Sequence, residues 1–263
     1  MPIRRFSSWF LLVILAIIIS YYVLFPHIWR CQWIAYSDFK KVTPTLYISP
    51  ELSAKHLQSA RRAMAEARRR IAKLWGTPAG EAIFILCEHT EEYRRYCNSG
   101  EGAGCSIGTP WGASYIILNP DGLNTDVIAH EMCHDELFTR LGWWTTTRQI
   151  PQWFNEGLAL MADHRFVAAS DSIQRYLDYK EECAYVSNGG QIVLSLDEIS
   201  SLHGFFNGNN GHVMLAYMTS GMEVSRWLAN TGTQHVPGLI NRIKSGETFE
   251  KAYQSLDQKK YQK

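Results

Sequence analysis

The sequence lacks a marked excess of either charge. Lysine and arginine number 26 against 25 aspartates and glutamates, which gives a formal net charge of +1. Nucleic-acid-binding proteins depend on an excess of cationic side chains that neutralise phosphates, so this balance argues against a nucleic-acid partner. The chain also contains no internal repeat and no low-complexity tract, which argues against a repeat architecture.

Two cysteine and glycine motifs are missing as well. No two of the six cysteines have the C-x-x-C spacing, so a separate structural zinc site is not indicated. Gly102 and Gly104 do not belong to a G-x-G-x-x-G turn between a strand and a helix, so no dinucleotide site is indicated. Cys97 and Cys105 bracket a short Gly-rich loop that can close as a disulfide, a bond that persists outside the cytosol.

A long apolar run is present near the N-terminus. Residues Phe6–Phe25 are almost all apolar, and such a helix of about 30 Å is long enough to span a bilayer core. A cleaved signal peptide is the alternative, but no small-x-small site follows the run, which favours an uncleaved anchor. Positive charges before and after the run are nearly equal, so they do not decide its orientation. The short preceding tail and the six cysteines favour export to a bacterial periplasm, with the anchor in the inner membrane.

The motif H-E-x-x-H occupies His130, Glu131 and His134, within the expected helix Asp126–Arg140. Residues i and i+4 of a helix share a face, so two such imidazoles can converge on one Zn²⁺ ion. Glu156 follows His134 by 22 positions and completes a set of two histidines and one carboxylate. Three protein ligands leave a fourth position for water, which is typical of catalytic zinc. An exposed helix with two surface histidines is the alternative interpretation.

The sequence around the motif favours a buried zinc helix. Asn124 or Thr125 can cap its start, and Gly142 can end it. The preceding segment Ser114–Pro120 is expected to be a short strand that ends in a turn. The Glu156 segment is expected to be a second short helix.

Two residues define that second helix. Pro151 suits its first turn. Gly157 interrupts it at a cost of about 1 kcal/mol relative to alanine. A glycine at this position makes sense if another backbone approaches closely there.

These segments resemble the gluzincin metallopeptidases, and most closely the peptidase MA-like domains. The resemblance is carried by His130-Glu131-x-x-His134 and by Trp153-x-x-Glu156-Gly157-Leu158-Ala159, and it extends over about Thr45–Tyr253. It implies an α+β, zincin-like fold with a small mixed sheet, a zinc helix, a helix with the glutamate ligand and a mostly helical C-terminal lobe. It also implies zinc-dependent hydrolysis of peptide bonds.

The expected organisation therefore has four parts. A short tail (1–5) precedes a transmembrane signal-anchor (6–25), a juxtamembrane linker (26–44) and a gluzincin-like peptidase domain (45–263).

The resemblance assigns roles within the expected site. His130, His134 and Glu156 would bind one zinc ion, and Glu131 would act as the general base toward a water molecule. A tyrosine or histidine from a later helix stabilises the oxyanion in related enzymes. Tyr217 is the candidate here, with His212 as the alternative.

Two features of the family are less clear in this sequence. An aspartate often follows the glutamate ligand by one helical turn, but Leu160 holds that position, which leaves Asp163 or Asp135 to support a zinc-bound histidine. The strand before the zinc helix is an exposed edge that pairs with substrate in related enzymes, and Ala113–Leu118 is expected to be that edge. A short edge strand in its own sheet, with no role in substrate binding, is the alternative.

The leading hypothesis is a membrane-anchored zinc peptidase that acts on peptides or exposed protein segments. The alternative is a catalytically silent, zinc-stabilised domain that binds a partner, although a structural site has no need of Glu131. An intramembrane protease is rejected because the H-E-x-x-H helix lies far from the apolar run and carries several charged residues. The sequence does not indicate an oligomeric state.

Overall fold

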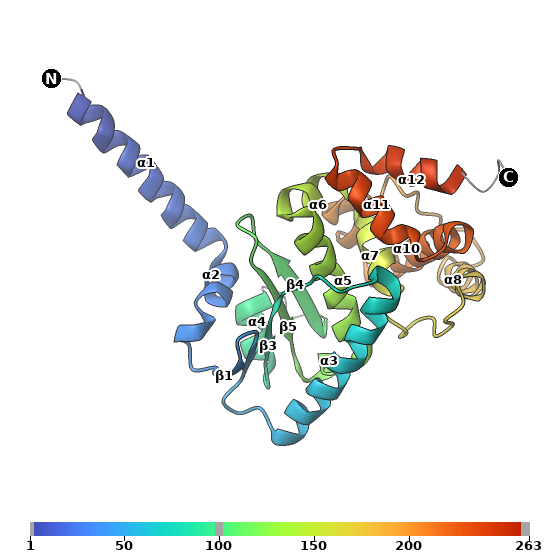
Figure 1. The fold of residues 1–263 in the computed structure, drawn as a ribbon, viewed down its shortest axis with the longest axis horizontal. Coiled ribbons are helices and arrows are strands. Elements are labelled where there is room, and N and C mark those ends of the chain that lie inside the picture. The colour runs from blue at the N-terminus through green and yellow to red at the C-terminus, as the bar shows by residue number, and fades with distance from the viewer. Residues whose placement is uncertain (1–2, 98–101, 259–263) are drawn as a thin grey trace.

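A five-stranded mixed sheet forms the first half of the molecule (Figure 1). The computed structural model describes residues 3–97 and 102–258, so residues 1–2 of the expected tail and 98–101 of the Gly-rich loop lie outside it. The strands follow the spatial order β1-β2-β3-β5-β4, and β2, β3 and β5 are mutually parallel, whereas β1 and β4 pair antiparallel at the two edges. Their bounds are β1 Lys40–Thr43, β2 Leu46–Ile48, β3 Ile83–Leu86, β4 Gly104–Gly108 and β5 Ser114–Leu118.

Successive side chains of a strand point to opposite faces of the sheet. Both faces of the three central strands are buried, since helices cover each of them. One face packs against helices α3 (Ala54–Trp75) and α5 (Thr125–Leu141), and it presents Leu46, Ile48, Phe84, Leu86, Ile116 and Leu118. The other face packs against α2 (Pro26–Gln32) and α4 (Thr90–Cys97), and it presents Tyr47, Ile85, Tyr115 and Ile117. The sheet is therefore covered on both sides, which explains why its strands read as nearly continuous apolar runs.

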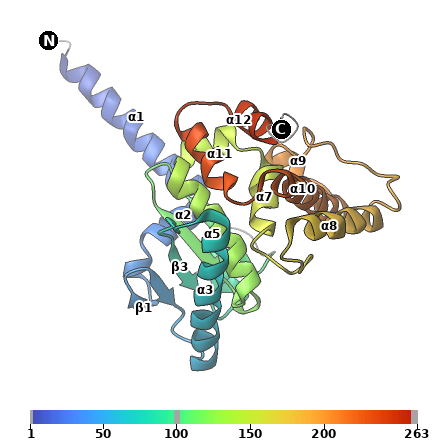
Figure 2. The same ribbon diagram turned by 45° about the vertical axis from the view of Figure 1, so that its right-hand side comes forward.

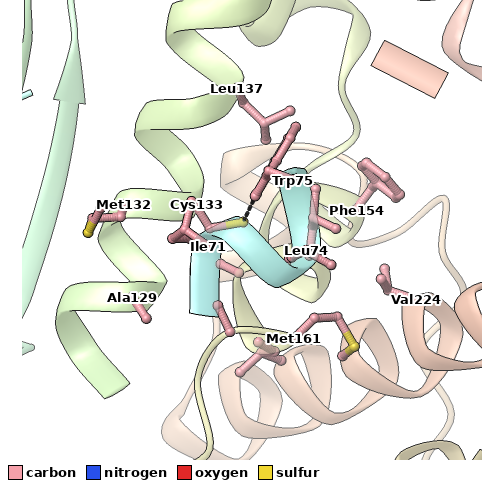
Figure 3. Packing of buried hydrophobic residues seen from close by; sticks show 14 of the residues in the cluster. Ile71, Leu74, Trp75, Ala129, Met132, Cys133, Leu137, Phe154, Met161 and Val224 are labelled. Carbon is pink, nitrogen blue, oxygen red and sulfur yellow. Dashed lines mark hydrogen bonds between the residues drawn. The ribbon is translucent and has the colours of Figure 1, made fainter. Parts of the chain in front are cut away.

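Helix α3 begins at the cap residue Ser53, whose side chain accepts a hydrogen bond from the His56 backbone N–H, and it packs along α5. At the end of α3 the Trp75 indole N–H donates to Cys133 Sγ of α5, with an Nε1–Sγ distance of 3.4 Å, within the hydrophobic core (Figure 3). Phe154 and Val224, from the second half of the chain, belong to the same core. One continuous core therefore fixes the sheet half and the helical half relative to each other.

The segment 26–44, expected to be a linker, is folded onto the sheet. It forms α2, a 3-10 turn (Ile34–Tyr36) and strand β1, and its side chains Cys31, Ile34 and Phe39 are buried. The Arg30 guanidinium donates a hydrogen bond to the Arg95 carbonyl, which links α2 to α4. The sequence signal for this burial was weak because only scattered apolar residues of the segment enter the core.

Helix α1 (Ile3–Leu24) precedes this segment and points away from the rest of the molecule (Figure 1). Within residues 3–97 and 102–258, no single helix meets the length and hydropathy expected of a membrane span. The pair Leu12–Leu24 and Pro26–Gln32 meets it jointly, with a bend of 93° between the two.

The second half of the chain is helical (Figure 2). Helix α10 lies centrally and packs against both α7 and α8. The bounds are α6 Trp143–Gln149, α7 Gln152–Leu160, α8 Ser172–Val186, α9 Leu202–Phe206, α10 Asn210–Thr231, α11 His235–Lys244 and α12 Phe249–Gln258, and a 3-10 turn (Pro120–Gly122) precedes α5. The mixed α+β class with a small sheet and mostly helical remainder is confirmed.

Candidate metal centre

Helix α5 brings the H-E-x-x-H motif into the interior. Its start is capped by Asn124, whose side-chain oxygen accepts hydrogen bonds from the Asp126 and Val127 backbone N–H groups. Gly142, with φ of 77°, ends the helix in a conformation that favours glycine. Every residue from Val127 to Leu137 is buried, so the motif lies in a core helix and the surface-helix interpretation is excluded.

The three expected ligands meet in space. His130 Nε2 lies 3.2 Å from Glu156 Oε2, and His134 Nε2 lies 3.7 Å from the same oxygen. The candidate ligand atoms all fall within 4.8 Å of one another, and all three residues are buried. Ligand atoms about 2 Å from a tetrahedral metal ion lie roughly 3.3 Å apart. The distances of 3.2 and 3.7 Å are close to that value, so these three residues could hold a metal ion.

The ligand atoms that face away from the centre lie close to other polar side chains. His130 Nδ1 lies 3.3 Å from Asp163 Oδ2, and His134 Nδ1 lies 2.9 Å from Asn155 Oδ1. Gln152 donates a 2.7 Å hydrogen bond to Glu156 Oε1. Metal-binding histidines typically have their second ring nitrogen oriented in this way. The outer atoms of His134 and Glu156 are therefore hydrogen-bonded, and His130 Nδ1 faces the Asp163 carboxylate at ion-pair distance without a hydrogen bond.

Asp163 is the aspartate that supports the centre, and Asp135 is not. The Asp163 carboxylate is buried and accepts hydrogen bonds from the backbone and guanidinium of Arg165. Although burial raises its pKa, His130 and Arg165 hold the pKa of Asp163 below its usual range. Asp135 instead accepts a hydrogen bond from the Ala82 backbone N–H, on the sheet side of α5.

Asn155 and Gln152 were not anticipated from the sequence. Gln152 precedes Glu156 by one helical turn, so the i, i+4 relationship places the two on the same face. That spacing was the available signal for Gln152. Asn155 is adjacent to the ligand in sequence, and no spacing rule would have assigned its side chain to His134.

The charge balance of the centre favours a cation. Burial lowers the pKa of His130, but the Asp163 and Glu156 carboxylates outweigh that effect and raise the pKa to about 10. A positive charge at this imidazole is thus stabilised by its surroundings. A divalent ion held between the three ligands would contact the Glu156 carboxylate directly, whereas Asp163 would face the outer nitrogen of His130.

Glu131 lies in the same cleft as the three ligands. Burial raises the pKa of the Glu131 carboxyl, an effect that His130 and His134 only partly oppose. A carboxylate with a raised pKa is a stronger base, which suits a residue that accepts a proton during a reaction.

Tyr217 of α10 also faces the centre, whereas His212 does not. The Tyr217 ring lies 6.5 Å from the His130 ring, centroid to centroid, and it lines the cleft. Burial raises the pKa of Tyr217, so its hydroxyl remains protonated and can donate a hydrogen bond. The Nε2 atom of His212 lies 2.8 Å from the Gly204 carbonyl oxygen and is engaged there.

A cleft of about 1070 Å³ opens over the centre. Strand β4 and α5 line it on one side, and α6, α7, α9 and α10 contribute most of the remaining lining, with single residues from α4 and α12. Four charged side chains besides the histidines line it: Glu131, Arg148, Glu156 and Glu250. The cleft is long enough to receive an extended peptide, because strand β4 alone covers five residues of it.

The expectation that Ala113–Leu118 forms the exposed edge of the sheet is wrong. Strand β5 pairs with β3 on one side and with β4 on the other, so it is internal, and β4 is the edge.

The sequence around β4 resembled a flexible loop because of its glycines, but two of them are required by packing against α5. A Cβ at Gly104 would lie 2.8 Å from Val127 Cγ1, and one at Gly108 would lie 2.7 Å from the Phe138 ring.

The cysteines at the rim of the cleft are joined as expected. Cys97, at the end of α4, forms a disulfide with Cys105 of β4. Among the described residues, Cys31, Cys87 and Cys133 are free and buried, and Cys183 is free and half-buried.

Comparison with known proteins does not assign a family: no protein-family model matches the chain, and no curated protein matches its sequence.

Proposed function

We propose that this chain is a zinc-dependent metallopeptidase of the gluzincin type with a zincin-like fold. The observation that carries the proposal is the convergence of His130, His134 and Glu156 within 4.8 Å of one another, beside Glu131 in an open cleft. In support of it, Asn155 and Gln152 are hydrogen-bonded to the outer atoms of His134 and Glu156, and the Asp163 carboxylate lies 3.3 Å from His130 Nδ1. Partners of this kind on the outer atoms of histidine and carboxylate ligands are typical of metal sites.

The chemistry divides among the residues of the cleft. A bound zinc ion would act as a Lewis acid that makes a water molecule acidic enough to react at neutral pH. Glu131 accepts a proton from that water and later delivers it to the nitrogen of the leaving amine. Tyr217 donates a hydrogen bond to the oxygen of the attacked carbonyl as negative charge develops on it.

The edge strand β4 supplies a binding surface for the substrate backbone. Its outer side has no partner strand among the described residues, and it lines the cleft along its whole length. An extended peptide can add to such an edge through main-chain hydrogen bonds, which confer affinity with little side-chain specificity. We therefore propose a peptide or an exposed protein segment as substrate.

We also propose that α1 anchors the enzyme in a bacterial inner membrane, with the cleft in the periplasm. The apolar run Phe6–Phe25 supports the anchor. The Cys97–Cys105 disulfide supports an oxidising compartment.

The proposal is tested by metal removal and return on the full-length chain purified in detergent. We expect a mixed peptide library to be cleaved by the zinc-loaded protein, not by the chelated protein, and again after one equivalent of zinc is restored. A structural role for zinc would instead leave the library intact in all three samples. Failure of the chelated protein to rebind zinc would contradict the metal site itself.

A further inference from the structure

A tryptophan lies at the tip of the hairpin that extends from the edge of the cleft. Strands β4 and β5 are joined by residues 109–113, and Trp111 is at the turn with 48 % of its surface exposed. The turn is closed by hydrogen bonds between Thr109 and Ala113 and by Gly112, whose φ of 91° favours glycine. The hairpin tip is therefore a rigid element that presents a large aromatic ring outward.

Trp111 contacts the base of α1, although the two segments are far apart in sequence. Its ring lies 5.9 Å from the Tyr21 ring, edge to face, and Tyr21 in turn contacts Phe25 and Trp29 at 5.1 and 5.8 Å. Figure 1 shows the hairpin tip beside the end of α1 that adjoins α2. We call Tyr21, Tyr22, Phe25, Trp29 and Trp111 the aromatic collar.

If α1 is the membrane anchor, the collar at its C-terminal end would lie at the surface of the bilayer. If α1 crosses the membrane, the 93° bend to α2 directs α2 along the membrane plane. Trp29 and the exposed Arg30 then lie on an interfacial helix, an environment that both residue types favour. Tyr22 and Phe25 are also exposed, at 58 % and 41 %.

The connection between the collar and the cleft is rigid. Helix α2 is fixed to the body by the buried Cys31 and by the hydrogen bond from Arg30 to Arg95. Strand β4 runs from Gly104 to Gly108 and continues directly into the hairpin tip. The Gly108 end of the cleft edge is thus the end nearer to the collar.

We propose that the aromatic collar docks on the lipid surface and holds the β4 edge of the cleft against it, so that the substrates are membrane-proximal segments of membrane-anchored polypeptides. The inference rests on the proposed peptidase activity and anchor, and it adds the class of substrate. An anchored domain on a flexible linker would sample all heights above the bilayer, whereas this attachment fixes the height of the cleft.

Docking is tested first, without activity. Full-length protein is reconstituted into vesicles of phosphatidylcholine and phosphatidylglycerol whose acyl chains carry bromine near the headgroup, a quencher of tryptophan fluorescence. The chain has nine tryptophans, and Trp111→Phe should lower the intensity lost to quenching per molecule by the contribution of one tryptophan. The matched control is Trp144→Phe on α6, 54 % exposed and outside the collar, which should lower the total emission but leave the intensity lost to quenching per molecule unchanged. Equal quenching in the wild type and Trp111→Phe would overturn the inference.

The substrate class is tested with two lipid-anchored peptides of one cleavable sequence. Their spacers are about 5 and about 20 residues, which reach roughly 17 and 66 Å when extended. We expect the wild type and Trp144→Ser to cleave the short-spacer peptide severalfold faster than the long-spacer peptide. Trp111→Ser should cleave the two at similar rates and should cleave a free peptide at the wild-type rate. An unchanged preference in Trp111→Ser would overturn the inference while the peptidase proposal stands. Failure of the wild type to cleave the free peptide would contradict the peptidase proposal, whereas the quenching result still decides the docking.

Discussion

Gly157 of α7 lies directly against the backbone of Ser220 in α10. A Cβ at position 157 would be 2.5 Å from the Ser220 carbonyl oxygen. The sequence predicted a close approach of another backbone at Gly157, and the place of this contact in the fold shows what it does. Gly157 follows the ligand Glu156, and Ser220 follows Tyr217 by one helical turn on the same face. The contact between the two helices therefore sets the position of a metal ligand and of the proposed oxyanion donor together.

The first prediction concerns this contact. Gly157→Ala should reduce the free energy of unfolding by about 1–3 kcal/mol, because the added methyl group must displace the α10 backbone. Gly238→Ala in α11 is the matched control, since a Cβ there has no atom within 4 Å. The control should be neutral or stabilising by up to about 1 kcal/mol, as alanine is the better helix former. Denaturant unfolding measures both, and equal losses in the two variants would contradict the packing argument.

The second prediction concerns the support of His130. Asp163→Asn should weaken zinc affinity by about 10- to 100-fold, because the amide is a poorer acceptor for the His130 ring and no longer carries a charge. The exposed Asp121 gives the control variant Asp121→Asn, which should bind zinc as the wild type does. Competition with a chromogenic chelator gives both affinities. Wild-type affinity in Asp163→Asn would show that the 3.3 Å approach has no role in metal binding.

The third prediction concerns Tyr217. Replacement by phenylalanine should lower kcat by about 10²- to 10³-fold and change KM little, because the hydroxyl acts mainly on the charge that develops during the reaction. Zinc content should not change. Tyr185→Phe, at a residue that is 83 % exposed, should leave both kinetic constants unchanged. If Tyr217→Phe keeps full kcat, another group stabilises the oxyanion.

The fourth prediction concerns pH and the free thiols. Burial raises the pKa of Cys183 from 9.0 to about 11, so at pH 8 its thiolate fraction in the folded protein is roughly a hundredfold below that of the unfolded chain. Iodoacetamide labelling, followed by mass spectrometry from pH 7 to 10, should show slow modification of the native protein and fast modification in denaturant. The unfolded chain releases the thiol proton first, so the same shift lowers stability as pH rises from about 9 toward 11. Equal labelling rates in both states would contradict the assignment.

Much of the candidate site was predictable because helix periodicity is local. The i, i+4 spacing of His130 and His134 requires only that the segment be helical, and the Asn124 cap and the Gly142 end are signals within the same stretch. The third ligand came from a resemblance between short motifs. The α+β class likewise follows from short apolar strands beside amphipathic helices such as α3.

The remaining features depend on contacts between distant segments. The glycines of β4 suggested a loop in the sequence. Strand pairing with β5 shows that they belong to an edge strand, and their packing against Val127 and Phe138 explains why glycine is required there. The contact between Tyr21 and Trp111 joins residues 90 positions apart, and no periodicity predicts it. Strand order is a tertiary property, which explains why β5 was wrongly expected at the edge of the sheet.

The fifth prediction tests the central claim, that Glu131 acts as the base beside a zinc ion held by His130, His134 and Glu156. The measurement is the cleavage of a mixed peptide library by zinc-loaded wild type and by zinc-loaded Glu131→Gln, with the metal content of both samples determined in parallel. We expect one zinc per chain in both proteins and cleavage by the wild type alone. Equal cleavage by the variant, or the absence of zinc from both proteins, would contradict it.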